Sequence, residues 1–179
     1  MKSLYILVFI TIASFHVSAQ TDERVKWYSF EEALKLTAEA PRNILIDVYT
    51  DWCGFCRQME AQTFNNPVIA RYINQNFYPV KFNGESTEPV HFAGHTFVNQ
   101  GNSRGSRGTR HDFATALGVT QGYPTVVYLT GDLKMIGAIP GFMRPEQIEP
   151  LLHWIVGEKY MSISLEEYQK TFVGEINRR

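Results

Sequence analysis

Cysteine is scarce in this sequence, because Cys53 and Cys56 are the only two among 179 residues. An exported domain that needs disulfides for stability usually has more cysteines, spread so that each bridge closes a long loop. A bridge between these two would close a very small ring and would add little stability. The pair therefore indicates reactivity rather than a structural cross-link.

An excess of charge of one sign is also missing. The chain has 17 Lys and Arg against 18 Asp and Glu, a formal net charge of −1. This balance gives no general argument for a nucleic-acid partner or for an anionic membrane surface, and we expect no nucleic acid to bind. Long apolar runs are missing too. Residues 4–13 are too few to span a bilayer comfortably, and no later run approaches about 18 apolar residues.

The N-terminal segment has the pattern of a signal peptide. Lys2 precedes the apolar run, and Val-Ser-Ala at residues 17–19 places small residues where a signal peptidase cuts. We therefore expect residues 1–19 to be removed by cleavage near Ala19. The remaining residues, 20–179, are expected to form one soluble domain that is periplasmic or secreted. A retained N-terminal anchor is the alternative.

The pattern of the remaining chain predicts an α/β order. Ser29 and Glu32 form a capping box that starts a helix, and the β-branched and aromatic run 43–50 predicts a strand covered on both faces. Asn66 and the following proline start another helix. Further predicted elements are a helix from Cys53, a strand at 77–83, a short helix at 112–119, two antiparallel strands within 124–139, a helix from Pro145 and a C-terminal helical extension at about 158–179. This order predicts a mixed central sheet flanked by helices.

Residues 84–110 interrupt this order. They show no periodicity and are rich in glycine, serine and arginine, so we predict an exposed, mobile insertion. Arg104, Arg107, Arg110 and His111 form a basic patch without the interleaved aromatic residues of single-strand binders. We expect a solvated loop there, and the alternative is an electrostatic guide for an acidic partner.

The spacing of the thiols is suited to redox chemistry. If Cys53 begins a helix, Cys56 follows nearly one turn later on the same face, with the two Cα atoms about 5 to 5.5 Å apart, which a disulfide allows. Unpaired amides and the helix dipole favour a thiolate on Cys53. Cys53 is thus expected to attack a partner disulfide, and Cys56 to resolve the mixed disulfide.

A proton acceptor for Cys56 is also predicted. Asp47 lies six residues before Cys53 on an apolar strand, so its carboxyl group can lie beneath the cysteines with a raised pKa. Lys81, on the neighbouring predicted strand, can tune it. A solvated residue at the strand end is the alternative for Asp47.

The motif ILIDVYTDWCGFC, followed by GYPTVVYL and GAIPGFMRPEQI, resembles the thioredoxin superfamily over roughly residues 43–157 without the insertion. Among its branches the chain is similar to exported bacterial thioredoxin-like proteins and to the C-terminal domain of the periplasmic membrane electron-transfer reductase. The resemblance implies a thioredoxin fold, with the insertion placed before the strand of the cis-proline. It matches Trp52, Cys53, Gly54 and Cys56 to the redox motif, Asp47 to the buried acid and Lys81 to its lysine neighbour.

The same resemblance implies a substrate groove. Pro124 matches the cis-proline that faces the thiols, Tyr123 exposes its backbone to an extended client segment, and Gly141 completes the groove. A proline that merely starts the strand is the alternative for Pro124, and packing alone is the alternative for Trp52.

These observations predict a thiol–disulfide oxidoreductase without an organic cofactor. Phe55, between the cysteines, offers the thiolate no stabilising charge, which favours a reductase. We expect it to pass electrons from a membrane-bound dithiol donor to the disulfides of client proteins. A thiol oxidase or disulfide isomerase is the first alternative. The second is a non-catalytic interaction module, in which His91 and His95 with the two cysteines hold zinc, although their spacing does not fit a zinc finger and we expect no metal.

Overall fold

The computed structural model describes residues 23–101 and 108–176. The predicted signal segment and two members of the basic patch, Arg104 and Arg107, lie outside the described residues. The main sheet has four strands in the order β2-β1-β5-β6: β1 (Asn43–Tyr49), β2 (Phe77–Asn83), β5 (Thr125–Leu129) and β6 (Met135–Pro140). β1 is parallel to β2, whereas β5 is antiparallel to both β1 and β6. The predicted mixed sheet is therefore confirmed.

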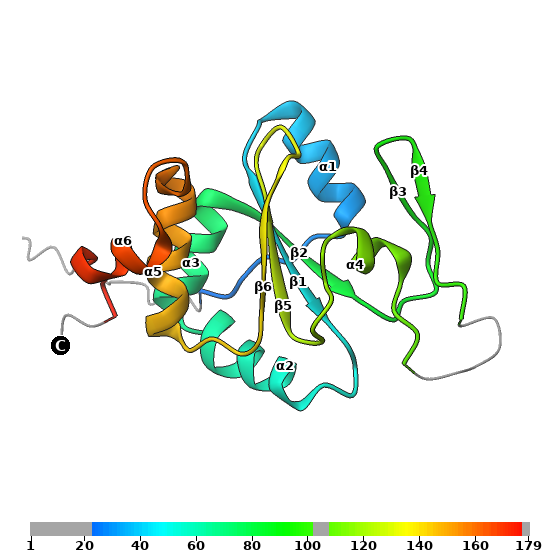
Figure 1. The fold of residues 1–179 in the computed structure, drawn as a ribbon, viewed down its shortest axis with the longest axis horizontal. Coiled ribbons are helices and arrows are strands. Elements are labelled where there is room, and N and C mark those ends of the chain that lie inside the picture. The colour runs from blue at the N-terminus through cyan, green and yellow to red at the C-terminus, as the bar shows by residue number, and fades with distance from the viewer. Residues whose placement is uncertain (1–22, 102–107, 177–179) are drawn as a thin grey trace, which may run out of the picture.

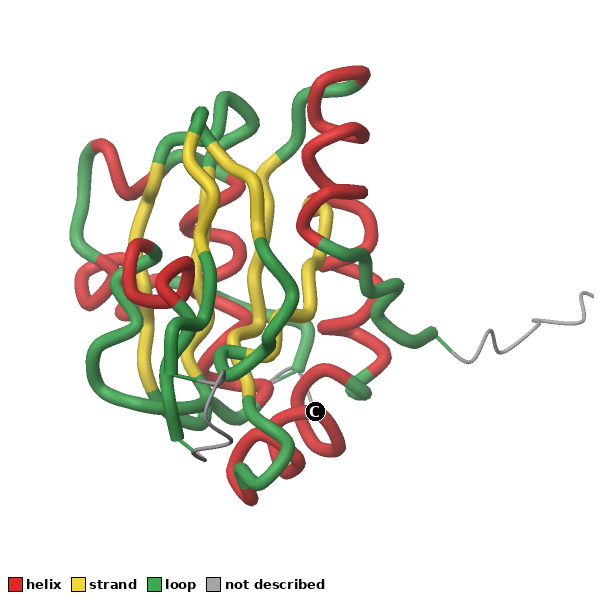
Figure 2. The backbone as a smooth tube through the Cα atoms, turned by 90° about the vertical axis from the view of Figure 1, so that its right-hand side faces the viewer, coloured by secondary structure: helices red, strands yellow, loops and turns green. Residues whose placement is uncertain are grey.

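Helices cover both faces of this sheet, as Figures 1 and 2 show. They are α1 (Phe30–Glu39), α2 (Gly54–Met59), the π-helical turn η1 (Glu60–Phe64), α3 (Pro67–Asn76), α4 (Asp112–Ala116), α5 (Pro145–Val156), the short η3 (Lys159–Met161) and α6 (Leu165–Thr171). One apolar core lies between the sheet and α3, η1 and α5, and a second between the sheet and α1 and α4.

Local sequence signals explain where several of these elements begin. The Ser29 hydroxyl accepts a hydrogen bond from the Glu32 amide while the Glu32 carboxylate accepts one from the Ser29 amide, so the predicted capping box is confirmed. Asn66 caps α3, whose first residue is Pro67. α1 and α3 lie on opposite faces of the sheet (Figure 1), so each cap sets where a helix that covers one face begins.

The insertion is more ordered than the sequence indicated. Residues 90–97 form a hairpin of β3 (Val90–Phe92) and β4 (His95–Phe97), and Val90 is buried in the core that contains α1 and α4. The prediction of a loop throughout 84–110 was therefore wrong for these residues. The strands have only three residues each, which is too short for a period of two to be recognised in the sequence.

His111 does not belong to an exposed basic patch, which corrects the second prediction for this region. Its side chain is fully buried, its Nδ1 accepts a hydrogen bond from the Phe113 amide at 3.0 Å, and its Nε2 lies 3.1 Å from the Glu88 carbonyl oxygen. Burial lowers the pKa of His111. A neutral imidazole, with Nδ1 as acceptor and Nε2 as donor, satisfies both contacts.

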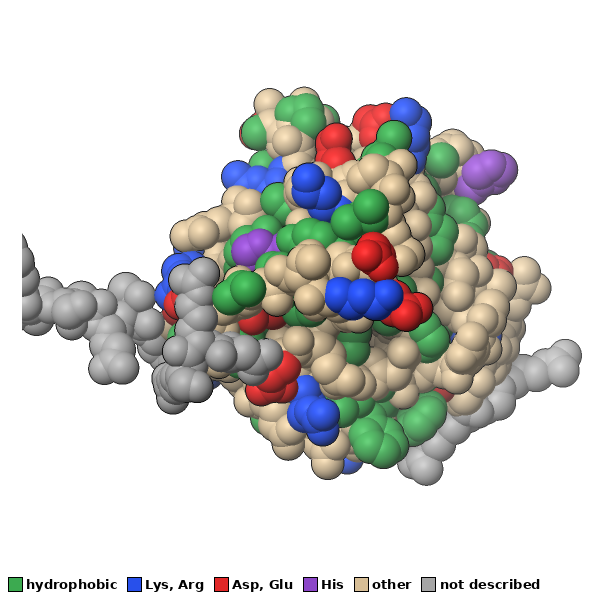
Figure 3. Space-filling view, turned by 60° about the vertical axis from the view of Figure 1, so that its left-hand side comes forward, with side chains coloured by type: hydrophobic (Ala, Val, Ile, Leu, Met, Phe, Trp, Pro, Cys, Tyr) green, Lys and Arg blue, Asp and Glu red, His purple; other side chains and the backbone are tan. Residues whose placement is uncertain are grey.

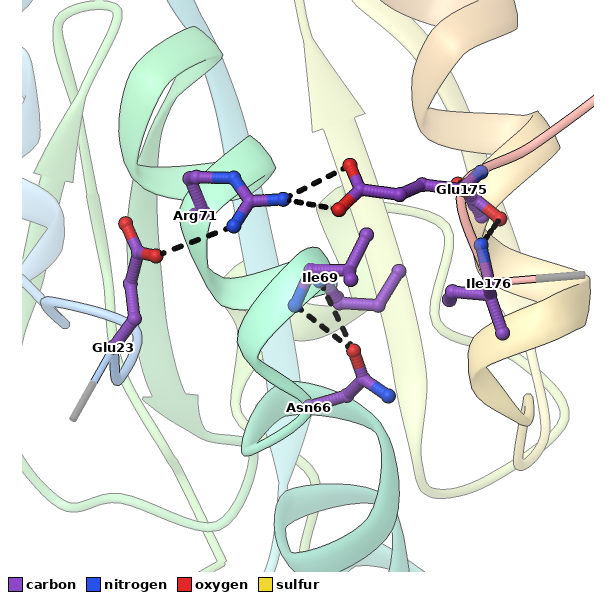
Figure 4. A network of polar contacts seen from close by, with 8 residues as sticks. Glu23, Asn66, Ile69, Arg71, Glu175 and Ile176 are labelled. Carbon is purple, nitrogen blue, oxygen red and sulfur yellow. Dashed lines mark hydrogen bonds and ion pairs between the residues drawn. The ribbon is translucent and has the colours of Figure 1, made fainter. Parts of the chain in front are cut away.

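The two ends of the described chain are attached to α3. Figure 4 shows Arg71 of α3 between Glu23 near the start and Glu175 near the end. Its Nη2 donates to both carboxylate oxygens of Glu175 at 2.7 and 2.9 Å, and its Nη1 lies 3.8 Å from Glu23. The predicted C-terminal helical extension thus packs against the domain, with α6 in contact with α5.

Charge on the surface is mixed. On the described part of the face in Figure 3, acidic and basic side chains alternate without a patch of one sign, in agreement with the near-neutral composition. Among the described residues, no helix has the length and apolar character needed to cross a membrane.

Candidate active site

Cys53 and Cys56 form a disulfide at the beginning of α2. Cys53 is the N-cap residue of the helix, and its Sγ accepts a hydrogen bond from the Cys56 amide at 3.0 Å. The two Cα atoms are 5.3 Å apart, as predicted from one helical turn. The same backbone can therefore hold either a disulfide or two thiols.

The position of Cys53 favours its anionic form after reduction. Amide groups in the first turn of a helix have no intrahelical acceptor, and the Cys56 amide already points at the Cys53 sulfur. Cys53 and Cys56 are only 4% and 7% exposed, whereas the flanking Trp52 and Phe55 are 60% and 62% exposed. The disulfide is thus buried although its two aromatic neighbours in the sequence face solvent, and the high exposure of Trp52 does not fit a purely packing role.

Asp47 is buried beneath the cysteines. It lies in the middle of β1 with 3% exposure, and its Oδ1 has no hydrogen-bond partner in the described part of the chain. Burial raises the pKa of Asp47 from its ordinary value of 3.8 to about 7, the Lys81 charge opposes this rise, and the Glu60 charge adds to it. The solvated strand-end alternative is therefore wrong. Near neutral pH this carboxyl group can both accept and release a proton.

Lys81 lies next to Asp47 because the two residues are directly paired between β1 and β2. Its Nζ is 4.0 Å from Asp47 Oδ2 and makes a closer ion pair with Glu60 of η1. The same ammonium lies 5.2 Å from the ring centroids of both Trp27 and Tyr49, within cation–π range. Lys81 is thus held between two carboxylates and two aromatic faces.

A pocket of about 350 Å³ connects these groups with the second cysteine. Its lining residues include Asp47, Cys56, Glu60 and Lys81. The Asp47 carboxyl group, with its pKa near 7, and Cys56 therefore line one cavity that is open to solvent. This arrangement is suited to proton transfer at Cys56.

The segment predicted to form the client groove, from Tyr123 to Gly141, has two unusual backbone features. The bond between Tyr123 and Pro124 is cis. Gly141 has φ of +95°, a conformation that favours glycine, and its amide donates to the Pro124 carbonyl at 2.8 Å. The ring of Tyr123 meets that of Trp52 edge to face, with centroids 6.2 Å apart, which places the cis-proline turn beside the redox motif.

A family model for a thioredoxin-like domain matches residues 30–154, and this range contains the disulfide, Asp47 and the cis-proline. The chain belongs to the thioredoxin-like family. This membership and the paired cysteines support a thiol–disulfide oxidoreductase in general.

Several known proteins resemble this thioredoxin-like protein. A thioredoxin-fold structure from Helicobacter pylori is 20% identical with a TM-score of 0.57, covering 73% of this chain and 83% of its own. A putative disulphide-isomerase from Bacteroides thetaiotaomicron is 22% identical with a TM-score of 0.53, covering 76% and 97%. At these identities, the likeness shows the fold.

Similarity in sequence is more local. An uncharacterised protein of Archaeoglobus fulgidus is 28% identical over 83 residues, 45% of this chain and 65% of its own length. The thiol:disulfide interchange protein DsbD of Vibrio vulnificus is 33% identical over 45 residues, which is 25% of this chain and 8% of DsbD. The chain therefore matches less than two thirds of either relative.

The structure brings together the site residues selected from the sequence. Asp47 and Lys81 lie on the inner side of the disulfide, and Trp52 and Tyr123 on its outer side. Glu60 was missed, although it lies four residues after Cys56 and thus on the same helical face. Its acidic side chain at that spacing was the available signal.

The histidines of the zinc alternative lie elsewhere. His91 and His95 are on opposite strands of the β3–β4 hairpin, and His91 Nδ1 is 3.0 Å from the Thr96 hydroxyl. Within residues 23–101 and 108–176, no group of three or more His, Cys, Asp or Glu side chains is arranged to hold a metal ion.

Proposed function

We propose that this thioredoxin-like protein is an exported reductase of protein disulfides. The single observation that carries the proposal is the cavity shared by Cys56 and buried Asp47, since a structural disulfide has no use for a proton acceptor with a pKa near 7. Membership of the family supports the general chemistry, and the features below support the direction and the location.

The reaction uses two thiol–disulfide exchanges. The Cys53 thiolate attacks one sulfur of a client disulfide, which forms a mixed disulfide and releases the other client sulfur as a thiolate. Asp47 then accepts the proton of Cys56, and the Cys56 thiolate attacks the Cys53 sulfur and releases the client sulfur that was bound to it. The client gains two electrons and becomes a dithiol, and the protein becomes the Cys53–Cys56 disulfide.

Phe55 supports the reductive direction. Its side chain is exposed and uncharged, so it adds no ionic stabilisation to the Cys53 thiolate. A thiolate that is less stabilised makes the reduced protein a better electron donor. The alternative is disulfide isomerisation, which the name of the Bacteroides thetaiotaomicron structure favours.

Location and partners complete the proposal. The charge, apolar run and small residues before Gln20 support export with cleavage near Ala19. A membrane-bound dithiol protein is the proposed electron donor, and oxidised proteins in the same compartment are the clients. N-terminal sequencing of the exported protein should begin at Gln20, and the finding of an intact Met1 would contradict cleavage.

A redox titration against glutathione tests the direction. A reductant should have a potential of about −270 mV, whereas a value of about −120 mV would identify an oxidant. In parallel, Cys56→Ser should accumulate mixed disulfides between Cys53 and clients because the resolving thiol is absent. Cys53→Ser is the matched control and should trap none. If neither variant traps a client while the wild type reduces insulin, the assigned roles are wrong.

A further inference from the structure

The first two residues of the insertion contact both aromatic side chains beside the thiols. The Trp52 Nε1 donates a hydrogen bond to Glu85 Oε2 at 3.1 Å, and the Tyr123 hydroxyl donates to the Gly84 carbonyl at 3.2 Å. The two rings meet edge to face. Two side chains that are 71 residues apart in the sequence (52 and 123) are thus joined through one short segment.

Gly84 has a tightly fixed place in this arrangement. Its amide donates to the Tyr49 carbonyl and its carbonyl accepts from the His111 amide, both at 2.8 Å. A Cβ atom at position 84 would lie 2.5 Å from Cε1 of Tyr123. Glycine is therefore needed because the tyrosine ring lies directly against the backbone, which leaves no room for a side chain.

Both backbone polar groups of Glu85 are hydrogen-bonded to asparagine side chains. Its amide donates to the Asn83 side chain at 2.9 Å, and its carbonyl accepts from Asn99 Nδ2 at 3.3 Å. The same Nδ2 donates to the Thr109 carbonyl at 2.8 Å, and Asn99 is only 8% exposed. A carboxylate on such a supported backbone can fix an indole ring that is otherwise exposed.

We propose that Gly84 and Glu85 are positioning residues that set client specificity by holding Trp52 and Tyr123 as one wall of the client groove. This inference rests on the proposed function, because it assigns a role within the same site. A wall that is already ordered costs a docking client less conformational entropy than a mobile one. A protein client covers the wall, whereas a small disulfide reaches the sulfurs without it, so the wall favours protein substrates.

Variants at position 85 separate the hydrogen bond from the charge. In the full mature protein, Glu85→Ala should raise KM for insulin disulfides about threefold to tenfold with kcat changed by less than about twofold, since an interaction used in docking is lost. Glu85→Gln keeps an oxygen acceptor for the indole and should restore most of the loss. Glu88→Ala removes a second, exposed carboxylate of the insertion and is the matched control.

A small aromatic disulfide is the second substrate. Its reduction should be much less sensitive to Glu85→Ala than insulin reduction. Equal losses with both substrates would overturn the proposal, because they would indicate damage to the thiols rather than to the wall. A wild type that reduces neither substrate would overturn the proposed function itself, and the next measurement would still test the contact.

Fluorine NMR measures how Trp52 is held in the wall, and it does not require the protein to reduce any substrate. The chain has three tryptophans, so protein labelled with 5-fluorotryptophan gives three resonances, and Trp52→Phe identifies the one of interest. Glu85→Ala should shift and narrow the Trp52 resonance and leave the other two in place, and Glu88→Ala should move none. An unchanged Trp52 resonance in Glu85→Ala would overturn the positioning role.

Discussion

Lys81 is shared between two carboxylates, with Glu60 as its closer partner and Asp47 at 4.0 Å. The register of β1 and β2 brings Asp47 beside Lys81, and η1 brings Glu60 to the same pocket. Burial raises the pKa of Asp47, the charge on Lys81 lowers it, and the charge on Glu60 raises it further. The protonation state of Asp47 is therefore coupled to both of its charged neighbours.

Replacing Asp47 by Asn should slow client release and stabilise the fold above neutral pH. The pKa of Asp47 is raised from 3.8 to about 7, so the folded state holds a proton that the unfolded state has lost between these values. The stabilisation that comes from protonated Asp47 is fully present below pH 3.8 and is lost as pH rises through about 7. This loss lowers the free energy of unfolding by an amount on the order of a few kcal/mol. Asp47→Asn should remove this loss.

Denaturant unfolding of the oxidised protein at pH 4 and pH 8 measures the effect. The gain from Asp47→Asn should be larger at pH 8, while Glu39→Gln, which changes an exposed acid, serves as the control. Single-turnover kinetics should show that the mixed disulfide persists longer in Asp47→Asn. An equal gain at both pH values would contradict burial of an ionisable carboxyl group.

Lys81 and Glu60 should shift the pKa of Asp47 in opposite directions. Lys81→Met removes the charge that lowers it, and Glu60→Gln removes one that raises it. We expect the pKa of Asp47 to rise in Lys81→Met and to fall in Glu60→Gln. Carbon-13 NMR titration of the Asp47 carboxyl group measures both, and the pH midpoint of client release should follow. Shifts of the same sign would mean that Lys81 acts through packing on Trp27 and Tyr49 instead of through charge.

Much of this site was predictable because its signals are local. The capping box at Ser29, the start of α3 at Asn66 and the placement of Cys53 at a helix start depend on residues within four positions of one another. Asp47 and Lys81 required only the assumption that two apolar strands are neighbours. The contact of Glu85 with Trp52 depends on how the insertion folds back, and several other acids were equally close in the sequence. Such contacts are determined by tertiary packing.

The buried His111 should make the fold sensitive to acid. Burial lowers the pKa of His111 from its ordinary value of 6.5. In the pH range between the lowered pKa and 6.5, the unfolded state therefore binds a proton that the folded state does not. Stability from this group is present above pH 6.5 and is lost as pH falls, because a protonated Nδ1 can no longer accept the Phe113 amide. His111→Asn keeps an N-cap acceptor and should be less sensitive to acid.

The test of His111 needs a background without the Asp47 carboxyl group, because Asp47 changes the free energy of unfolding in the opposite direction over the same pH range. Unfolding free energies at pH 7.5 and pH 5 should therefore be compared between Asp47→Asn and the double variant with His111→Asn. The single variant should lose more stability on acidification. Equal losses would show that His111 is protonated in the folded state.

The C-terminal segment should depend on one buried carboxylate. Glu149 of α5 is 3% exposed, and its oxygens accept hydrogen bonds from the amides of Glu175 at 2.5 Å and Ile176 at 3.3 Å. Glu149→Gln turns one acceptor oxygen into an NH₂ donor that faces a backbone amide, which should lower the free energy of unfolding of this segment by about 1 to 3 kcal/mol. Hydrogen exchange at residues 172–176 should accelerate strongly, while Glu146→Gln, at an exposed acid of the same helix, should leave it unchanged.

Because this segment packs on α3 and α5, away from the thiols, insulin reduction by Glu149→Gln at low temperature should match that of the wild type. Loss of reduction with intact far-UV circular dichroism would instead show that the segment supports the active site.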